Sequence, residues 1–158
     1  MALNQKTNVV RILEAKQITH QVYEYSVEDQ RLDAVSVAQK VGFDPERVFK
    51  TLVTIGKTTG INVFVVPGNC ELNLKKAAEA AGDKHIEMVK SKELLPLTGY
   101  IHGGCSPIGM KKDYRTFLEE MAAEYNDIII SAGKIGMQVR LSPLDLLSLT
   151  AGTLADLV

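Results

Sequence analysis

Two runs of β-branched residues, separated by a short glycine-bounded segment, constrain the fold most strongly. Residues 48–55 and 61–66 are rich in valine, isoleucine and threonine, and the segment 56–60 between them begins and ends with glycine. Such runs are typical of strands, and a short connection that contains glycine predicts a β-hairpin. The hairpin places a sheet at the centre of the expected fold.

Segments with helical and strand patterns lie on both sides of this hairpin. We expect helices at 7–17, 34–41, 71–81, 91–95, 116–124 and 143–149, a helical turn at 44–46, and further strands at 20–27, 127–131 and 137–141. Asp33 and Gly42 have the residue types that begin and end a helix. Strand pairs mixed with helices predict an α/β domain with a mixed sheet that is curved or partly closed.

Composition and charge narrow the class of protein. The 158 residues suffice for one domain, and 46% hydrophobic with 23% charged residues is ordinary for a globular chain. A net charge of -1 argues against bulk electrostatic binding of nucleic acid, although a local patch stays open. Two cysteines without an apolar leader predict a reducing cytoplasm, and no apolar run approaches the ~18 residues of a membrane span.

The segment 99–112, Gly-Tyr-Ile-His-Gly-Gly-Cys-Ser-Pro-Ile-Gly-Met-Lys-Lys, is the strongest candidate for a binding site and is called the glycine loop below. Glycine lets a backbone approach a ligand closely, and successive backbone N–H groups in such a loop can bind an anion. The composition therefore predicts a loop that holds phosphate or carboxylate oxygens. The alternative is a structural loop that turns between strands.

The usual chemistries of such loops do not fit these residues. A Walker A loop needs lysine where Met110 stands, and a Ser106 nucleophile needs the following residue to donate an N–H that Pro107 lacks. His102 and Cys105 are too few for a zinc site, and the remaining cysteine and histidines are scattered. We expect no metal and no cofactor, and we expect Cys70 and Cys105 to be small buried hydrophobic residues.

Lys50 is the one charged side chain in the first strand of the predicted hairpin. With the period of two of a strand, it shares a face with Leu52 and Thr54. A lysine at this place is either a solvated strand end or an ammonium group in a cleft, where it holds a carbonyl or phosphate oxygen. The spacing alone leaves both interpretations open.

Three motifs together resemble one known family. They are Glu-Arg-Val-Phe-Lys-Thr-Leu at 46–52, the glycine loop, and Ser-Ala-Gly-Lys-Ile-Gly at 131–136. In order and spacing the chain resembles the YbaK/EbsC family of free-standing Cys-tRNA(Pro) deacylases, within the editing domains associated with prolyl-tRNA synthetase. The resemblance implies one domain over residues 1–158, with a curved, partly closed, mixed sheet of six or seven strands surrounded by helices.

The resemblance also implies which residues form the site. Lys50 matches the essential catalytic lysine of the family. The residues that match its substrate-binding positions are Tyr25, Thr51, Gly103, Gly104, Ser106, Pro107, Ser131 and Gly133. The chain departs from the pattern at Ile135, where many members have arginine, and at Gln138, where some have an acid. No role of those two side chains is carried over.

The activity that the resemblance implies is the removal of cysteine from mischarged tRNA(Pro), with the cysteinyl thiol attacking its own ester. This scheme needs no catalytic triad and no metal, in keeping with the residues above. Mischarged tRNA is then the substrate and prolyl-tRNA synthetase a candidate partner. Two alternatives stay open: deacylation of Ala-tRNA(Pro) or another mischarged tRNA, and a non-catalytic module that binds tRNA ends or nucleotides.

Overall fold

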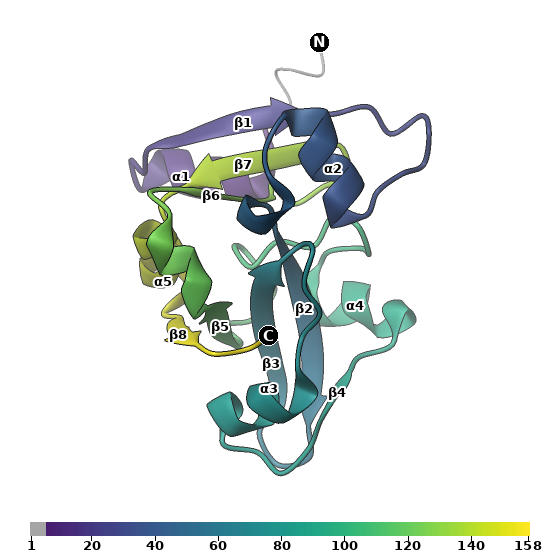
Figure 1. The fold of residues 1–158 in the computed structure, drawn as a ribbon, viewed down its shortest axis with the longest axis vertical. Coiled ribbons are helices and arrows are strands. Elements are labelled where there is room, and N and C mark those ends of the chain that lie inside the picture. The colour runs from purple at the N-terminus through teal and green to yellow at the C-terminus, as the bar shows by residue number, and fades with distance from the viewer. Residues whose placement is uncertain (1–5) are drawn as a thin grey trace.

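Two sheets form the framework of residues 6–158, the part of the chain that the computed structural model describes (Figure 1). One sheet has the strand order β1-β7-β6 and the other the order β4-β2-β3-β5-β8. The elements are α1 (Asn8–Ala15), β1 (His20–Glu24), α2 (Ala34–Val41), η2 (Pro45–Arg47), β2 (Phe49–Gly56), β3 (Gly60–Pro67), α3 (Leu74–Ala81), β4 (Ile86–Met88), α4 (Ser91–Thr98), β5 (Arg115–Glu119), η3 (Glu120–Glu124), β6 (Ile128–Ser131), β7 (Met137–Leu141), α5 (Pro143–Thr150) and β8 (Thr153–Ala155). The mixed α/β class is confirmed, but the strands are divided between two sheets where one sheet of six or seven was expected.

The predicted hairpin is confirmed as β2 and β3, which pair antiparallel from Phe49 opposite Pro67 to Gly56 opposite Gly60. Gly60 has a φ of +75°, a conformation that glycine adopts without strain. The two sheets meet near the start of β2, where Val48 forms an isolated parallel bridge with Ile129 of β6. This junction brings the beginning of the hairpin next to the three-stranded sheet.

The predicted helix at 116–124 is wrong over its first half. Residues 115–119 form β5, which pairs parallel to β3 on one side and to β8 on the other. Thr116–Glu119 are all buried, as expected for a strand inside a sheet and not for one stripe of a surface helix. Only the second half keeps a helical form, as the 3₁₀ turn η3. Tertiary pairing thus overrides the local helix propensity of this segment.

The helices begin and end close to the predicted residues. α2 coincides with the expected range, with Asp33 accepting a hydrogen bond from the Ser36 N–H at 3.0 Å and Gly42 in the left-handed region at φ +83°. α4 continues past its expected end at Leu95 to Thr98, with Pro96 inside the helix. The short strands β4 and β8 were not expected from the sequence.

The five-stranded sheet is covered on both faces. Val63 and Val65 of β3 belong to the larger core cluster, which also contains Val9 and Leu13 of α1 and Ile130 of β6. The intervening residues of β3 point to the other face, because side chains alternate along a strand. There Phe64 stacks on Phe117 at 5.2 Å and packs against Ala77, Ala78 and Ala81 of α3.

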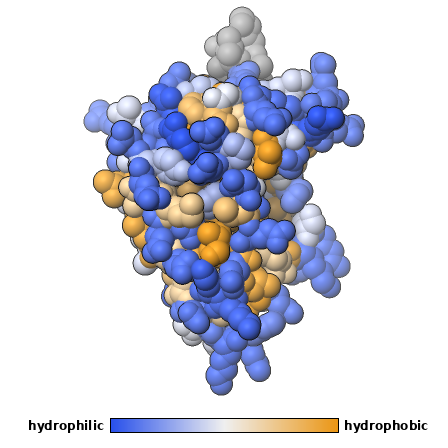
Figure 2. Space-filling view, in the orientation of Figure 1, coloured by the Kyte–Doolittle hydropathy of each residue, from blue (hydrophilic) through white to orange (hydrophobic). Residues whose placement is uncertain are grey.

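Polar side chains cover most of the face in Figure 2, and apolar residues appear there as separate small patches. Among residues 6–158 there is no helix with the length and hydropathy needed to span a bilayer.

Candidate active site

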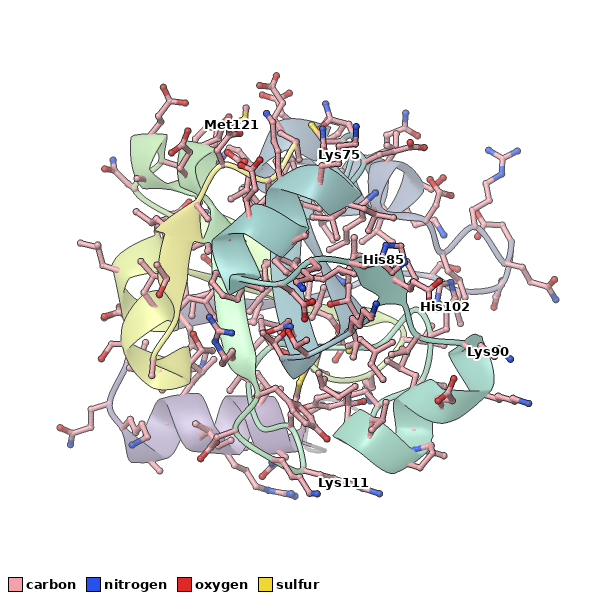
Figure 3. All side chains as sticks on the ribbon, turned by 90° about the horizontal axis from the view of Figure 1, so that it is seen from below. Lys75, His85, Lys90, His102, Lys111 and Met121 are labelled. Carbon is pink, nitrogen blue, oxygen red and sulfur yellow. The ribbon has the colours of Figure 1, made fainter. Side chains whose placement is uncertain are left out.

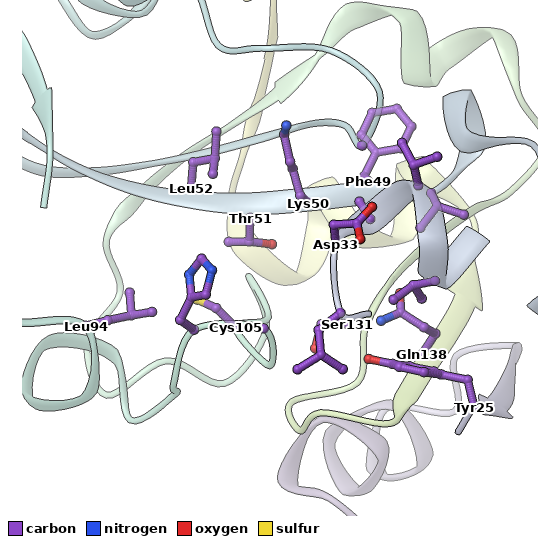
Figure 4. A pocket seen from close by; sticks show the side chains of 18 residues that line it. Tyr25, Asp33, Phe49, Lys50, Thr51, Leu52, Leu94, Cys105, Ser131 and Gln138 are labelled. Atoms are coloured by element: carbon purple, nitrogen blue, oxygen red, sulfur yellow. The ribbon is translucent and has the colours of Figure 1, made fainter. Parts of the chain in front are cut away.

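A cavity of about 380 Å³ opens at the start of β2 (Figure 4). Its walls come from residues 48–52, from residues 32–37 at the beginning of α2, from the glycine loop, and from the ends of β6 and β7. β4 pairs with β2 only from Thr54 to Gly56, so residues 50–52 have no strand partner on that edge within the described chain. The cavity therefore lies at a part of β2 where β4 does not pair with it.

Five of the nine predicted site residues line this cavity, and they come from four separate parts of the chain: Tyr25, Lys50, Thr51, Gly103 and Ser131. The structure thus brings together most of what the three motifs contain. The other four, Gly104, Ser106, Pro107 and Gly133, are not among the lining residues. Their assigned roles in substrate binding stay predictions, and their surroundings indicate a packing role.

The glycine loop packs closely against the turn 131–136. A Cβ on Gly104 would lie 2.9 Å from the backbone nitrogen of Ile135, so only glycine allows this approach. Ser106 is fully buried, and its hydroxyl oxygen accepts a hydrogen bond from the Ile108 N–H at 3.3 Å. Gly133 has a φ of +96°, and a Cβ there would lie 3.0 Å from Val9. These residues hold the loop and the turn together behind the cavity wall.

Lys50 and Thr51 leave β2 in opposite directions, with Thr51 on the side of Ser131 and Cys105 (Figure 4). Lys50 is half-buried and lines the cavity. No carboxylate lies within 4 Å of its ammonium group in the described part of the chain. A lysine that is removed from water usually pairs with an anion. Because Lys50 has no such partner among the described residues, its ammonium group is available to an anionic or carbonyl oxygen of a ligand.

Two polar groups around the cavity lack hydrogen-bond partners within residues 6–158. The hydroxyls of Tyr25 and Thr51 are buried without a partner, and both residues line the cavity. Leaving a buried polar group unsatisfied costs about 1–3 kcal/mol. Native structures keep few such groups, and their concentration at one cavity indicates a polar ligand.

Neighbouring contacts position Tyr25. Its backbone N–H donates to the Gly136 carbonyl at 2.9 Å, and the Lys40 ammonium lies 5.8 Å from its ring centroid. The same ammonium donates to the carbonyls of Ser26 and Arg31, at 2.8 Å and 2.9 Å. α2 therefore anchors the loop after β1 and keeps the Tyr25 side chain at the cavity.

The surroundings shift the pKa values of two ionisable groups at the cavity, Asp33 and Cys105, in opposite directions. The hydroxyl and N–H of Ser36 bond to Asp33 and hold the pKa of its carboxyl below the ordinary value. Burial raises the pKa of the Cys105 thiol to about 12, so this group is a neutral thiol near pH 7. Cys105 and Leu94 give the cavity an apolar end, consistent with the expectation of a hydrophobic role for this cysteine.

Sequence reasoning did not assign Asp33, Leu94, His102 or Gln138 to the site. Asp33 was expected only as a helix cap, and Gln138 was noted only as a departure from the family pattern. His102 was considered only as a metal ligand, yet it is exposed and lines the cavity. No group of three or more His, Cys, Asp or Glu side chains suited to a metal occurs among the described residues.

Basic side chains surround α4, whose Leu94 lines the cavity. Lys90 precedes the helix, and Lys111 is tied to its end by an N–H···O bond of 3.1 Å to the Thr98 carbonyl. Figure 3 shows Lys90, His102 and Lys111 on the side of the molecule that carries α4. We call these three residues the basic rim; its two lysines are exposed and offer positive charge beside α4.

Comparison with known proteins agrees with the motifs. Residues 28–149 match the family model described as the aminoacyl-tRNA editing domain. An Enterococcus faecalis protein with the provisional name Cys-tRNA(Pro)/Cys-tRNA(Cys) deacylase EbsC is 51% identical over 97% of this chain and 93% of its own length. A proline–tRNA ligase of Shouchella clausii is 32% identical over 57% of this chain and 17% of the ligase.

Solved structures agree as well. A crystal structure provisionally described as a trans-editing enzyme for prolyl-tRNA synthetase superimposes with a TM-score of 0.83 at 28% identity, over 97% of this chain and 98% of the other. The match therefore covers nearly the whole fold, including both sheets. The resemblance that the three motifs indicate is confirmed, and the chain belongs to the aminoacyl-tRNA editing domain family.

Proposed function

We propose that this protein is an aminoacyl-tRNA deacylase that removes cysteine from mischarged tRNA(Pro). The observation that carries the proposal is the pair of unsatisfied hydroxyl groups, of Tyr25 and Thr51, at one cavity beside a lysine without an ionic partner among the described residues. An aminoacyl ester on a terminal ribose supplies carbonyl, hydroxyl and phosphate oxygens for these groups. The name of the 51% identical relative supports the same substrate class.

The chemical step uses the substrate's own thiol. The cysteinyl sulfur attacks the ester carbonyl, and a carbon–sulfur bond forms while negative charge develops on the carbonyl oxygen. The carbon–oxygen bond to the ribose then breaks, and the proton of the thiol ends on the leaving ribose oxygen. The products are a cyclic thiolactone and free tRNA, and water later opens the thiolactone to cysteine.

The protein supplies orientation and electrostatic stabilisation in this scheme. Lys50 holds the carbonyl oxygen as it becomes negative, and the hydroxyls of Thr51 and Tyr25 donate to the ester and ribose oxygens. Holding reacting groups in the correct geometry can supply ~7–11 kcal/mol, and one oxyanion donor about 2.7–4 kcal/mol. Cys105 takes no part as a nucleophile, in agreement with its raised pKa of about 12.

A panel of charged tRNAs tests the proposal. We expect the wild-type protein to release cysteine from Cys-tRNA(Pro) well above the buffer rate, and Lys50→Ala to lose most of this activity. S-methylcysteinyl-tRNA(Pro), which has no free thiol, should resist cleavage. Absence of cysteine release contradicts the function, and cleavage of the S-methyl substrate contradicts the self-attack mechanism.

Alanyl and seryl tRNA(Pro) belong in the same panel. A methylene difference in a hydrophobic pocket is worth only ~1–3 kcal/mol, so the size of the cavity discriminates weakly among small side chains. Under the self-attack mechanism the thiol decides, and Ala-tRNA(Pro) should react far more slowly than Cys-tRNA(Pro). Faster release of alanine identifies the alternative substrate and requires a water nucleophile.

We further propose that the protein works beside prolyl-tRNA synthetase in the cytoplasm, where tRNA is charged. A net charge of -1 provides little long-range attraction for a polyanion, so a partner that grips the tRNA compensates for weak binding. Adding the synthetase at a tRNA concentration below KM should accelerate cysteine release. An unchanged rate contradicts the partnership and leaves the deacylase activity standing.

A further inference from the structure

Asp33 is the one carboxylate among the described residues that line the cavity. Its Oδ2 accepts a hydrogen bond from the Ser36 N–H at 3.0 Å, and its Oδ1 accepts one from the Ser36 hydroxyl at 2.7 Å. These two bonds fix the carboxylate at the beginning of α2. A carboxylate oxygen can accept a second hydrogen bond, so both oxygens can still bind a cation.

The cavity contains opposite charges that do not neutralise each other. Lys50 lines it as well, yet no ion pair within 4 Å joins Lys50 to Asp33 or to any other carboxylate of residues 6–158. The hydroxyls of Tyr25 and Thr51 add an independent sign of a polar ligand, because both residues line the same cavity and both hydroxyls are buried without a hydrogen-bond partner among the described residues. A ligand that suits both charges has to carry a cationic and an anionic group.

We propose that Asp33 binds the α-ammonium group of the aminoacyl ester. This assignment rests on the deacylase function proposed above. The end of a charged tRNA has one cationic group, the α-ammonium, and its neighbouring carbonyl oxygen becomes anionic during the reaction. An ionic bond from Asp33 to the ammonium fixes the carbon next to that carbonyl. It thereby directs the carbonyl oxygen to Lys50 and limits rotation of the cysteinyl thiol.

The assignment has a consequence for selectivity. Peptidyl-tRNA and N-acylated aminoacyl-tRNA have an amide in place of the ammonium, so they lose this ionic bond and place a larger group at Asp33. The carboxylate therefore helps the enzyme to leave a growing peptide on its tRNA intact. The capping role of Asp33 does not require the charge, because asparagine and serine cap a helix about as well as aspartate.

The substitution Asp33→Asn removes the negative charge of this side chain but keeps its ability to cap α2. The test compares kcat/KM on Cys-tRNA(Pro) with that on 3-mercaptopropionyl-tRNA(Pro), which keeps the thiol and the ester but lacks the amine. A hydrogen bond between charged groups is worth about 1.5–3 kcal/mol, and the exposure of Asp33 favours the lower end. We therefore expect roughly a tenfold loss on the cysteinyl substrate and a change below about twofold on the analogue.

Asp44→Asn is the matched control, since it makes the same change at the exposed start of η2, outside the cavity. It should alter neither rate. If Asp33→Asn lowers kcat/KM equally on both substrates, only the helix cap was damaged, and the assignment is overturned. No loss of kcat/KM on either substrate overturns it as well. Asp33→Ser, a second variant that keeps the cap, should repeat the result of Asp33→Asn.

An equilibrium measurement keeps the assignment independent of turnover. The 3′-amide analogues of cysteinyl-adenosine and 3-mercaptopropionyl-adenosine cannot be cleaved as esters. The wild-type protein should bind the cysteinyl compound about tenfold more tightly than the other, and Asp33→Asn should remove this preference. Equal affinity of the wild-type protein for both overturns the role of Asp33, whereas failure to release cysteine from tRNA contradicts the deacylase function instead.

Discussion

β2 and the glycine loop both contribute to the cavity, but they do so in different ways. β2 contributes the consecutive residues Lys50, Thr51 and Leu52, because its edge at this point has no strand partner among the described residues. The glycine loop contributes His102, Gly103 and Cys105, while the run from Ser106 to Ile108 lies buried behind the wall. A segment in which many residues match a family motif therefore need not place all of those residues at the cavity.

The physical reason lies in the turn 131–136. Both Gly103 and Gly104 face Ile135, and a Cβ on the first would lie 3.5 Å from its side chain, against 2.9 Å to its backbone for the second. The loop thus holds in place the turn that brings Ser131 to the cavity. We expect changes in β2 to affect the chemistry first, and changes in the buried part of the loop to affect stability first.

The largest effect is expected for Lys50→Ala in β2. Loss of one donor to a developing oxyanion costs about 2.7–4 kcal/mol, so kcat should fall by about 10²–10³. The thermal midpoint should stay near that of the wild type, because Lys50 has no ionic partner to lose. Lys57→Ala, an exposed lysine in the β2–β3 turn, is the control and should leave kcat unchanged. Retention of full activity in Lys50→Ala contradicts the proposed role of β2.

Gly104→Ala probes the loop and should act on stability. The added methyl group meets backbone atoms of Ile135 and Lys134 at 2.9 Å and 3.1 Å, and backbone cannot move aside as a flexible side chain does. Overpacking of this kind costs about 1–3 kcal/mol, measured as the free energy of unfolding in urea. An activity loss at unchanged stability points to ligand contact by Gly104 and abolishes the distinction between strand and loop.

The sequence predicts those segments whose secondary structure is determined by contacts between residues close together in the chain. It fails where contacts with distant segments determine that structure. α2 and the β2–β3 hairpin follow from caps, turns and periodicity, which are local. β5 does not, because its strand form depends on pairing with β3, about fifty positions earlier in the chain, and with β8 near its end. The short strands β4 and β8 have the same origin, since each is defined by its partner more than by its own residues.

The site divides in the same way. Lys50 and Thr51 stand in a motif that a reader of the sequence can find. Asp33 and Gln138 reach the cavity only because α2 and β7 fold over the start of β2, and no local pattern separates them from an ordinary cap or strand residue. Their significance comes from their position at the cavity, which is a property of the folded chain.

Two threonines of β2, Thr51 and Thr54, differ in whether their hydroxyls have a hydrogen-bond partner. Thr51 has a buried hydroxyl without a partner, whereas the Thr54 hydroxyl donates to the Asn62 carbonyl at 2.8 Å. Thr51→Val should keep or raise stability and reduce kcat/KM by roughly fivefold, since about 1 kcal/mol of hydrogen bonding is lost to the substrate alone. Thr54→Val should lower the unfolding free energy by about 1 kcal/mol without changing the rate. Equal behaviour of the two variants contradicts the assignment of Thr51 to the substrate.

The smallest effect is expected at the basic rim, beyond both β2 and the buried part of the loop. Lys111 is exposed near the end of α4, where its ammonium can approach a tRNA phosphate. Lys111→Gln should raise KM for charged tRNA about twofold at low salt without changing kcat, and the difference should vanish as salt increases, because phosphate contacts release counterions. Lys75→Gln, on α3, is the matched control and should leave KM unchanged. A fall in kcat for Lys111→Gln instead means that the glycine loop transmits changes at its end to the chemistry, and it joins the loop to β2 as a catalytic unit.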